Sequence, residues 1–361
     1  DEVTGVDASA FADHCGKGAG GMSRFALETA EERADFIHQF AIPAKIPAYI
    51  VEKDFWVCWL LGRIFATPGL GADCVFKGGT SLAKVFGAIS RFSEDIDLGL
   101  SPASLGWSET DLDDAPSMSQ RRKRMEKISA DCAVAVANKF RAELEQVVGD
   151  VLGTRPDGGN WLTYELEAAS HSPVLYFAFP QAVPPGVYVA PVVKIEFGSL
   201  TDQRPTGTHA IAPLIAQLAP GAFDDFQAEV VALEIERTFW EKATILHAEF
   251  HRPVGQAFRD RFARHYADFA SLWRHPGGQR AAARLDLLAR VRLHKSRYFG
   301  SAWANYATAV PGTLRILPPD ARLAELRRDY AAMTAMFLST PPKFEEMLAT
   351  LREAEQALNT P

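Results

Sequence analysis

Residues 77–98 read KGGTSLAKVFGAISRFSEDIDL, and this stretch decides how the rest of the chain is interpreted. A short apolar run precedes two glycines, and a helical pattern follows them. Gly78 and Gly79 fit a tight turn that a ligand can approach closely, because neither carries a side chain. We expect Thr80 or Ser81 to cap the helix that follows. Free amide groups at such a helix terminus can bind phosphate, so the stretch predicts a phosphate-binding turn.

The same stretch ends in a predicted strand that carries two carboxylates. Side chains alternate across a strand, so Asp95 and Asp97 share one face while Ile96 and Leu98 point toward the core. Two residues of strand span about 6.6 Å, which lets both carboxylates approach one or two metal ions. Magnesium prefers hard oxygen ligands and tolerates phosphate oxygens beside them. The pattern therefore predicts a metal site next to the phosphate-binding turn.

A third carboxylate is present on a later predicted strand. In VKIEF at 193–197, Lys194 and Glu196 fall on one face and the apolar residues fall on the other. Glu196 can complete a three-carboxylate metal site. A solvent-exposed strand face is the alternative explanation of the same pattern.

The composition is that of an ordinary globular protein. The 361-residue chain is 47% hydrophobic and 23% charged, and no apolar run reaches the length of a membrane span. The four cysteines show no zinc-like spacing, so we expect reduced thiols in a cytoplasmic protein: Cys15, Cys58, Cys74 and Cys132.

The net charge of −7 argues against a protein that coats nucleic acid by bulk attraction, yet it permits a local basic face. Basic side chains cluster at 121–127 and again at 284–297. The second cluster and its aromatic neighbours fit phosphates and stacked bases: Arg292, Lys295, Arg297, Tyr298 and Trp303. A solvated helix surface is the alternative for either cluster.

Changes in hydrophobic periodicity along the chain divide it into three segments. Residues 1–66 are predicted to form a leader and N-terminal helices, 67–204 a mixed core, and 205–361 a helical C-terminal domain. Strand-like stretches occur in the core at 161–168, 174–179 and 192–198. From about residue 223 helical periods dominate. We predict an α/β fold of the α+β type, with a mixed sheet core, N-terminal helices and a large helical C-terminal half.

With these motifs the chain resembles the nucleotidyltransferase superfamily, and more closely the AbiEii/AbiGii toxin family of minimal bacterial nucleotidyltransferases. The resemblance rests on GGTSL and RFSEDIDL and on four further blocks, one before them and three after: EKDFWV (52–57), VVKIEFG (192–198), ERTFWEKATILH (236–247) and RHYADFASL (264–272). It implies a nucleotidyltransferase-like core.

The resemblance also implies roles for individual residues. The nucleotide-phosphate turn is matched by Gly78, Gly79 and Thr80. The motif that binds metal and nucleotide is matched by Ser93, Asp95 and Asp97. Two further active-site residues of similar toxins are matched by Lys242 and Asp268. The second metal-binding block is a bare acidic strand in the family, and we map it onto Glu196.

Lys242 can also be interpreted without the resemblance. It lies in an apolar helical pattern from which a long cation can reach a triphosphate, with a surface cation as the alternative. No acidic residue lies three or four positions away to pair with it. We therefore expect that replacing Lys242 weakens nucleotide use more than it destabilises the fold. Arg264, His265 and Asp268 fall within about one helical turn and can form a polar cluster, but we leave His265 outside the catalytic set.

These features predict an enzyme that uses a nucleoside triphosphate with Mg²⁺ or Mn²⁺ and releases pyrophosphate. Toxins of this type resemble enzymes that add nucleotides to the 3′ end of transfer RNA, and a neutralising antitoxin is normally encoded beside them. The alternatives are modification of a protein, as in AMPylation, or of a small molecule. A catalytically inactive nucleotide-binding regulator is a further alternative, against which the intact S-x-D-x-D pattern argues.

Overall fold

The computed structural model describes residues 21–108, 110–111, 113–168, 170–186, 190–219 and 226–360. Most of the predicted leader, including Cys15, lies outside these residues. The other three cysteines are buried free thiols, as the sequence predicts: Cys58, Cys74 and Cys132.

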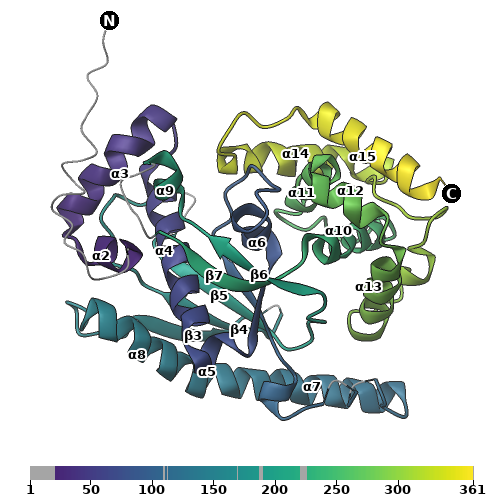
Figure 1. The fold of residues 1–361 in the computed structure, drawn as a ribbon. Coiled ribbons are helices and arrows are strands. Elements are labelled where there is room, and N and C mark those ends of the chain that lie inside the picture. Colours follow the sequence, from purple (N-terminus) through teal and green to yellow (C-terminus); the bar gives the residue numbers. More distant parts are fainter. Residues whose placement is uncertain are drawn as a thin grey trace, which may run out of the picture. The chain divides into compact units, whose positions relative to one another are not determined.

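Seven strands form one mixed sheet in the described part of the chain, in the order β3-β4-β5-β2-β1-β7-β6 (Figure 1). Their bounds are β1 (Cys74–Lys77), β2 (Ile96–Leu100), β3 (Leu162–Leu166), β4 (Pro173–Phe177), β5 (Val193–Gly198), β6 (Thr206–Ile211) and β7 (Ala228–Leu233). Strand β2 pairs parallel with β5, and β1 pairs parallel with β7, whereas β4 is antiparallel to both β3 and β5. The mixed sheet confirms the predicted fold class.

Eight α-helices precede β7 in the described part of the chain. They are α2 (Gly21–Leu27), α3 (Ala30–Ala44), α4 (Ala48–Ala66), α5 (Pro68–Gly71), α6 (Gly78–Lys84), α7 (Met118–Ala135), α8 (Arg141–Leu152) and α9 (Leu214–Leu218). A π-helical turn, Val136–Phe140, joins α7 to α8 in one continuous helical run. Pro47 stands at the N-cap position of α4, where the sequence predicts a break.

The predicted C-terminal domain, residues 205–361, contains strands β6 and β7 among its described residues, and after β7 its named elements are helices. It contains α10 (Ile235–Phe250), α11 (Ala263–Arg274), α12 (Pro276–Ala282), α13 (Leu285–Tyr298), α14 (Leu323–Met333) and α15 (Phe344–Asn359). The prediction that helical structure dominates from about residue 223 is wrong at 228–233, which form β7 beside β1. Only Glu234 separates β7 from α10, and no glycine or proline marks a turn between them.

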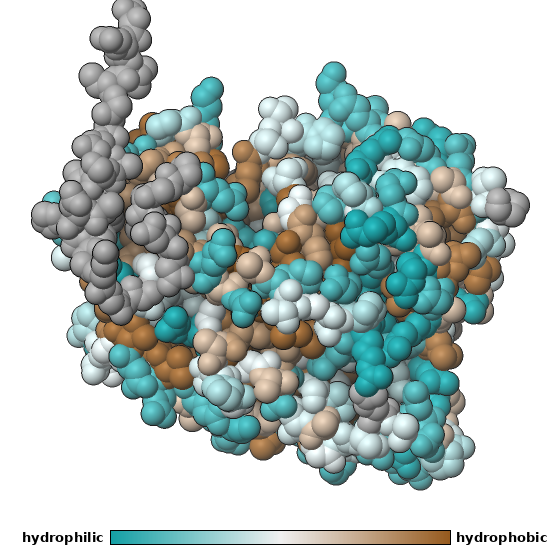
Figure 2. Space-filling model, viewed as in Figure 1, coloured by the Kyte–Doolittle hydropathy of each residue, from teal (hydrophilic) through white to brown (hydrophobic). Residues whose placement is uncertain are grey.

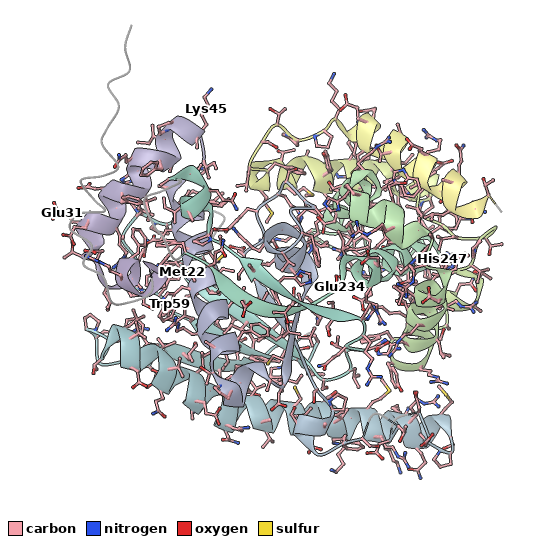
Figure 3. All side chains as sticks on the ribbon, viewed as in Figure 1. Met22, Glu31, Lys45, Trp59, Glu234 and His247 are labelled. Carbon is pink, nitrogen blue, oxygen red and sulfur yellow. The ribbon has the colours of Figure 1, made fainter. Side chains whose placement is uncertain are left out.

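Helix α4 is the centre of the N-terminal core. Residues 50–62 of this helix are all buried, so it is enclosed on every side rather than packed on one face. Trp59, labelled in Figure 3, stacks on Phe177 of β4 with ring centroids 5.9 Å apart. Trp56 stacks on Phe179 in the same way at 5.8 Å. These contacts fix the helix against the strands that lead to the carboxylates.

The chain divides into two compact units. The first contains Asp1–Phe76, Glu94–Thr201 and Thr208–Ala232, and it holds nearly all of the sheet. The second contains Lys77–Ser93, Asp202–Gly207 and Leu233–Pro361, and its apolar core is built mainly from α10, α11 and α15. The division into three sequence segments remains a prediction.

The surface carries no single large apolar area on the face drawn in Figure 2, where hydrophilic and hydrophobic side chains of the described residues are interspersed. The most exposed large apolar side chains belong to different elements: Ile42, Met118 and Val254. Within the part of the chain that the structure describes, no helix is long and apolar enough to cross a membrane.

Candidate functional site

Helix α6 begins at the first glycine of the motif. Gly78 has a φ of 85°, in the left-handed region that favours glycine. The prediction that Thr80 or Ser81 caps the helix is wrong, because the N-cap position is Lys77 and makes no side-chain cap. The glycine lets the helix start earlier, so Thr80 lies inside the first turn. There the buried Thr80 hydroxyl donates a hydrogen bond to Ser93 Oγ at 3.0 Å.

The second glycine packs against two polar side chains. A Cβ atom at Gly79 would lie 2.8 Å from Arg91 Nη2 and 2.8 Å from Ser93 Oγ, which is too close for any other residue without rearrangement. The turn and Ser93 are therefore brought together, as the motif predicts. Arg91 joins them, although no pattern in the sequence predicts a role for it.

Lys242 is part of a buried charge network between α10 and α11. Only 7% of the residue is exposed, and its Nζ donates to Asp268 Oδ2 at 2.7 Å. His265 Nδ1 lies 3.3 Å from the same Nζ. Asp268 also accepts two hydrogen bonds from Arg91, at 2.7 Å from Nε and 2.9 Å from Nη2. The carboxylate partner that Lys242 lacks on its own helix thus comes from α11.

The pKa shifts in this network follow from burial and from neighbouring charges. Burial alone would raise the pKa of Asp268, but Arg91 and Lys242 hold it well below its usual value. Burial lowers the pKa of Lys242, and Asp268 opposes that shift. Burial and the Lys242 charge lower the pKa of His265 far enough to keep its imidazole neutral. Two cations and one anion therefore leave the network with one excess positive charge.

The carboxylate strand in the first unit is arranged differently. Asp97 on β2 and Glu196 on β5 are register partners on adjacent parallel strands. Ile96 and Leu98 are fully buried, as the alternation predicts. Asp95 immediately precedes β2, and its pKa is raised to about 6 by burial and then by the negative charges of Glu94, Asp97 and Glu196. Like charges therefore face one another here.

Glu196 is the least available of the three carboxylates. Lys194 lies on the same face of β5 and donates a short hydrogen bond to Glu196 Oε1. The same ammonium group donates to Glu167 at 2.9 Å. The position of Glu196 beside Asp97 fits a metal ligand. Its partly exposed ion pair with Lys194 fits the alternative, a solvent-exposed strand face.

These carboxylates fit a divalent cation by their chemistry. All three supply hard oxygen donors, and burial together with the neighbouring carboxylates raises the pKa of Asp95, an effect that a bound cation would oppose. Among the residues that the structure describes, no group of three His, Cys, Asp or Glu side chains forms a ready-made metal cage. Cation binding would therefore have to draw the side chains together.

Two charged residues of α4 support the carboxylate strand and were missed as individual residues. Lys53 is 3% exposed, and its Nζ donates to Glu94 Oε2 at 2.7 Å and to the Ala190 carbonyl at 3.0 Å. Glu52 is also buried, and it accepts from the backbone N–H of Ala182 at 2.6 Å. Buried charges in an apolar helix are the signal that could have identified them.

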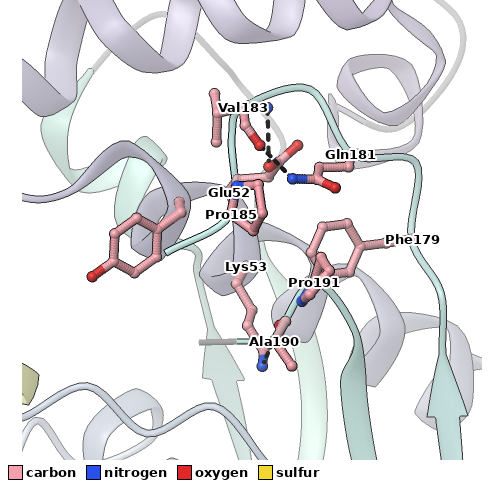
Figure 4. Close-up of a pocket in the computed structure, with 9 residues that line it drawn as sticks. Glu52, Lys53, Phe179, Gln181, Val183, Pro185, Ala190 and Pro191 are labelled. Carbon is pink, nitrogen blue, oxygen red and sulfur yellow. Dashed lines mark hydrogen bonds between the residues drawn. The ribbon is translucent and has the colours of Figure 1, made fainter. Parts of the chain in front are cut away.

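The same two residues line a small pocket in the first unit with about 200 Å³ of empty volume (Figure 4). Tyr49 and Phe179 provide aromatic walls, and Val183 lies beside the Glu52 carboxylate. Lys53 extends away from this group toward Ala190. The pocket is thus linked to the carboxylate strand through the Lys53–Glu94 ion pair.

The basic residues of α13 are less open than the sequence suggests. Arg290 donates two hydrogen bonds to Asp202, which also binds Arg237 at 2.6 Å. Arg237 is fully buried in this ion pair. Arg292 and Arg297 are half-buried. In the other basic segment, Arg122 and Lys123 are exposed on α7, although Arg122 lies 3.8 Å from Glu126.

A glycine turn into a short helix, followed by a D-x-D strand in a mixed sheet, is the arrangement expected of a nucleotidyltransferase. The chain belongs to the AbiEii family, because the family model described as "Nucleotidyl transferase AbiEii toxin, Type IV TA system" matches residues 59–352. This confirms the family that the motifs predict and makes the protein a nucleotidyltransferase toxin of that family.

Among solved structures, the chain is similar to MenT4, a nucleotidyltransferase toxin from Mycobacterium tuberculosis. The two share 16% sequence identity with a TM-score of 0.44, over 99% of this chain and 91% of the other. No curated protein matches the chain. The roles of the individual site residues remain predictions.

Proposed function

We propose that the protein transfers a nucleoside monophosphate from a nucleoside triphosphate to the 3′ hydroxyl of an RNA, most favourably a transfer RNA. The acceptor oxygen forms a bond to the α-phosphorus, the bond from that phosphorus to the bridging oxygen breaks, and pyrophosphate leaves. The acceptor proton passes to solvent. Family membership supports the transfer chemistry, and the pairing of Asp97 with Glu196 on adjacent strands, with Asp95 directly before β2, is the structural observation that supports metal dependence.

Asp95 and Asp97, with Glu196 as a third ligand, would hold Mg²⁺ or Mn²⁺. When bound, the cation neutralises charge on the phosphates and polarises the α-phosphate. Asp95 must be deprotonated to serve as a ligand, and its pKa of about 6 means that this is its state at neutral pH. The Lys53–Glu94 ion pair holds the segment that leads into Asp95.

The triphosphate is assigned to residues of the second unit. Gly78, Gly79 and Thr80 supply the turn, where the absence of a Cβ at Gly79 lets Arg91 Nη2 and Ser93 Oγ pack directly against the backbone. Ser93 accepts a hydrogen bond from Thr80, which leaves its own hydroxyl proton to donate to a phosphate oxygen. Lys242 brings the excess positive charge of the buried network, which attracts a polyanion more strongly than a solvated surface lysine would.

RNA is favoured as the acceptor because the exposed basic residues are local on an acidic protein. Arg122 and Lys123 on α7 are exposed, and Arg292 and Arg297 lie on α13. Recognition of a folded RNA by its shape and free end needs only such limited contacts. The family description also implies a partner, and we propose that a cognate antitoxin protein neutralises the enzyme.

The test uses each ribonucleoside triphosphate with a labelled α-phosphate, and transfer RNA whose 3′ end is either intact or oxidised with periodate. We expect label on intact RNA with Mg²⁺ or Mn²⁺, and none on oxidised RNA or with a chelator. Label that appears on protein while RNA stays inert at low salt would replace the RNA acceptor by the protein-modifying alternative. Label on oxidised RNA would contradict attack by the 3′ hydroxyl.

A further inference from the structure

We propose that Arg91 is a positioning residue that keeps the positive charge of Lys242 available to the triphosphate. The inference rests on the proposed function, since it takes Lys242 as the residue that meets the nucleotide phosphates. It adds a residue to which neither the motifs nor the family match assigns a role. All the groups involved belong to the second unit.

The first step is the geometry of the Arg91 side chain. It is 5% exposed and forms a two-point contact with Asp268, in which Nε binds Oδ1 and Nη2 binds Oδ2. A planar guanidinium matches a carboxylate in this way, whereas a lysine cannot. Arg91 thus engages both oxygens of Asp268, and Lys242 shares only Oδ2 with it.

The second step is the charge that remains for Lys242. If Asp268 had no other partner, one carboxylate and one ammonium would cancel each other and the network would be neutral. Arg91 shares the carboxylate, so the network carries one excess positive charge. His265 adds none, because Lys242 has only protons to offer and His265 Nδ1 must therefore accept as a neutral imidazole.

The third step concerns the direction of the Lys242 ammonium. Two of its three protons are directed to Asp268 Oδ2 and His265 Nδ1. The remaining proton is the one that a phosphate oxygen can accept. Arg91 itself lies against the glycine turn, since its Nη2 would touch a Cβ at Gly79. Arg91 thus connects the turn assigned to the phosphates with the charge network of Lys242.

The backbone of Arg91 is also fixed. Arg91 forms a β-bridge with Phe337, and the neighbouring Phe92 N–H donates to the Met336 carbonyl at 2.7 Å. On the other side, the Leu338 N–H donates to the Ser90 carbonyl at 3.0 Å. These hydrogen bonds fix the backbone from which the Arg91 side chain extends, as a positioning role requires.

The experiment measures the dissociation constant of a non-hydrolysable nucleoside triphosphate in the full-length protein. Arg91→Gln removes the excess charge, and we expect about tenfold weaker binding, the usual effect of removing one charge-assisted hydrogen bond. The double variant Arg91→Gln with Asp268→Asn restores one net positive charge on Lys242. We expect it to bind the triphosphate more tightly than Arg91→Gln alone, even though both variants are less stable than the wild type.

A purely structural arginine gives a different result, and the chain offers a matched control. Arg322 is 4% exposed and binds Glu325 at 2.8 Å and the Pro253 carbonyl at 3.0 Å, and neither of these partners belongs to the Lys242 network. Arg322→Gln should lower the melting temperature and leave the dissociation constant unchanged. Equal binding by Arg91→Gln and wild type, or no recovery in the double variant, would overturn the inference.

Two further variants keep the outcome interpretable. If Arg91→Gln does not fold, Arg91→Lys preserves the charge, and we expect affinity within about threefold of wild type. Binding as weak as that of Lys242→Met would then contradict the electrostatic role. If Lys242→Met itself binds the triphosphate normally, the proposed function of Lys242 fails. If Lys242→Met binds weakly while the Arg91 variants bind normally, only the role of Arg91 fails.

Discussion

The Lys242 network and the carboxylate strand are both clusters of charged side chains, but the charges around their central carboxylates differ in sign. In the network, Asp268 is only 1% exposed and each of its oxygens has a cationic partner. On the carboxylate strand, the nearest charges to Asp95 are mostly of its own sign, and its pKa rises to about 6. The network carries an excess of positive charge, whereas the carboxylates of the strand outnumber Lys53 and Lys194, the lysines paired with Glu94 and Glu196.

This difference indicates how the two clusters would work. Buried charges are costly unless partners are in place, so the network is fixed before any ligand binds and can present a preset positive charge. Like-charged carboxylates are destabilising until a cation arrives, so the strand gains stability only on metal binding. The protein thus holds its anion site ready and leaves its cation site under electrostatic repulsion.

The largest expected effect follows from removing a charge on the carboxylate strand. Asp97→Asn should reduce nucleotide transfer by about 10²–10³-fold or more, as loss of a group that stabilises charge in the transition state usually does. The fold should remain intact, because Asp97 is only partly buried beside a core-facing Ile96. Transfer assays at matched protein concentration, with a thermal melt of each sample, measure both quantities. Wild-type activity in this variant would remove Asp97 from the metal site.

The second expected effect is on Lys242, where the structure changes the prediction made from the sequence. Lys242→Met should weaken triphosphate binding by about 10–100-fold. It should also lower the free energy of unfolding by about 1–3 kcal/mol, because a buried ion pair is broken while Arg91 still holds Asp268. Calorimetric titration and chemical denaturation measure the two losses.

The matched control for Lys242 is Lys139→Met, which replaces an exposed lysine of the first unit. It should change neither the dissociation constant nor the unfolding free energy by a measurable amount. A Lys242 variant that loses stability but binds the triphosphate normally would show a purely structural ion pair.

A third effect concerns pH. Because the pKa of folded Asp95 is raised from 3.8 to about 6, the folded state disfavours its ionisation, and stability is lost as the pH rises through this interval. Asp95→Asn removes that penalty. Without metal, the variant should therefore be more stable than wild type by about 1–3 kcal/mol at about pH 7.5 and nearly equal to it at about pH 4.

Thermal melts of metal-free protein across this pH range test the prediction. Asp320→Asn, which replaces an exposed carboxylate of the second unit, serves as control and should follow wild type at every pH. If Asp95→Asn is destabilised at the neutral end of the range, the carboxylates do not repel one another in the way the comparison requires.

The smallest expected effects lie outside both clusters. Arg122→Gln with Lys123→Gln on α7, and Arg292→Gln with Arg297→Gln on α13, should each lower RNA labelling only a few-fold. Each pair should also flatten the salt dependence by about one unit of slope for every phosphate that the variant no longer neutralises. Triphosphate binding should be unchanged in both. An RNA yield that is unaffected by either pair would exclude these surfaces from acceptor binding.

Much of this fold can be predicted because the spacing of apolar residues, glycines and carboxylates within a short segment indicates its secondary structure. Period-two alternation identifies β5, and the order glycine pair, helix, D-x-D strand identifies the centre of the motif. The same reasoning fails at β7, where only Glu234 separates the strand from α10 and no glycine or proline marks the boundary. It also misplaces the start of α6, since Gly78 adopts a positive φ that no pattern specifies.

The partners within the site are harder to predict for a different reason. Arg91 and Asp268 are 177 residues apart in sequence, and no helical or strand period links them. A search for a partner of Lys242 along its own helix finds none, because the partner comes from α11. Sequence patterns thus identify residues able to do the chemistry, whereas the contacts that set their charge depend on the packing of distant segments.

Two binding measurements on two variants test most directly whether the Lys242 network and the carboxylate strand have separate roles. The network is proposed to bind the triphosphate, and the strand is proposed to bind the metal. Mn²⁺ binding without nucleotide is followed by electron paramagnetic resonance, and triphosphate binding without metal is followed by calorimetry. We predict that Asp97→Asn loses Mn²⁺ binding but keeps metal-free triphosphate binding, and that Lys242→Met shows the reverse. If both variants lose both activities equally, or if Asp97→Asn binds Mn²⁺ as wild type does, the two clusters do not have the separate roles assigned to them.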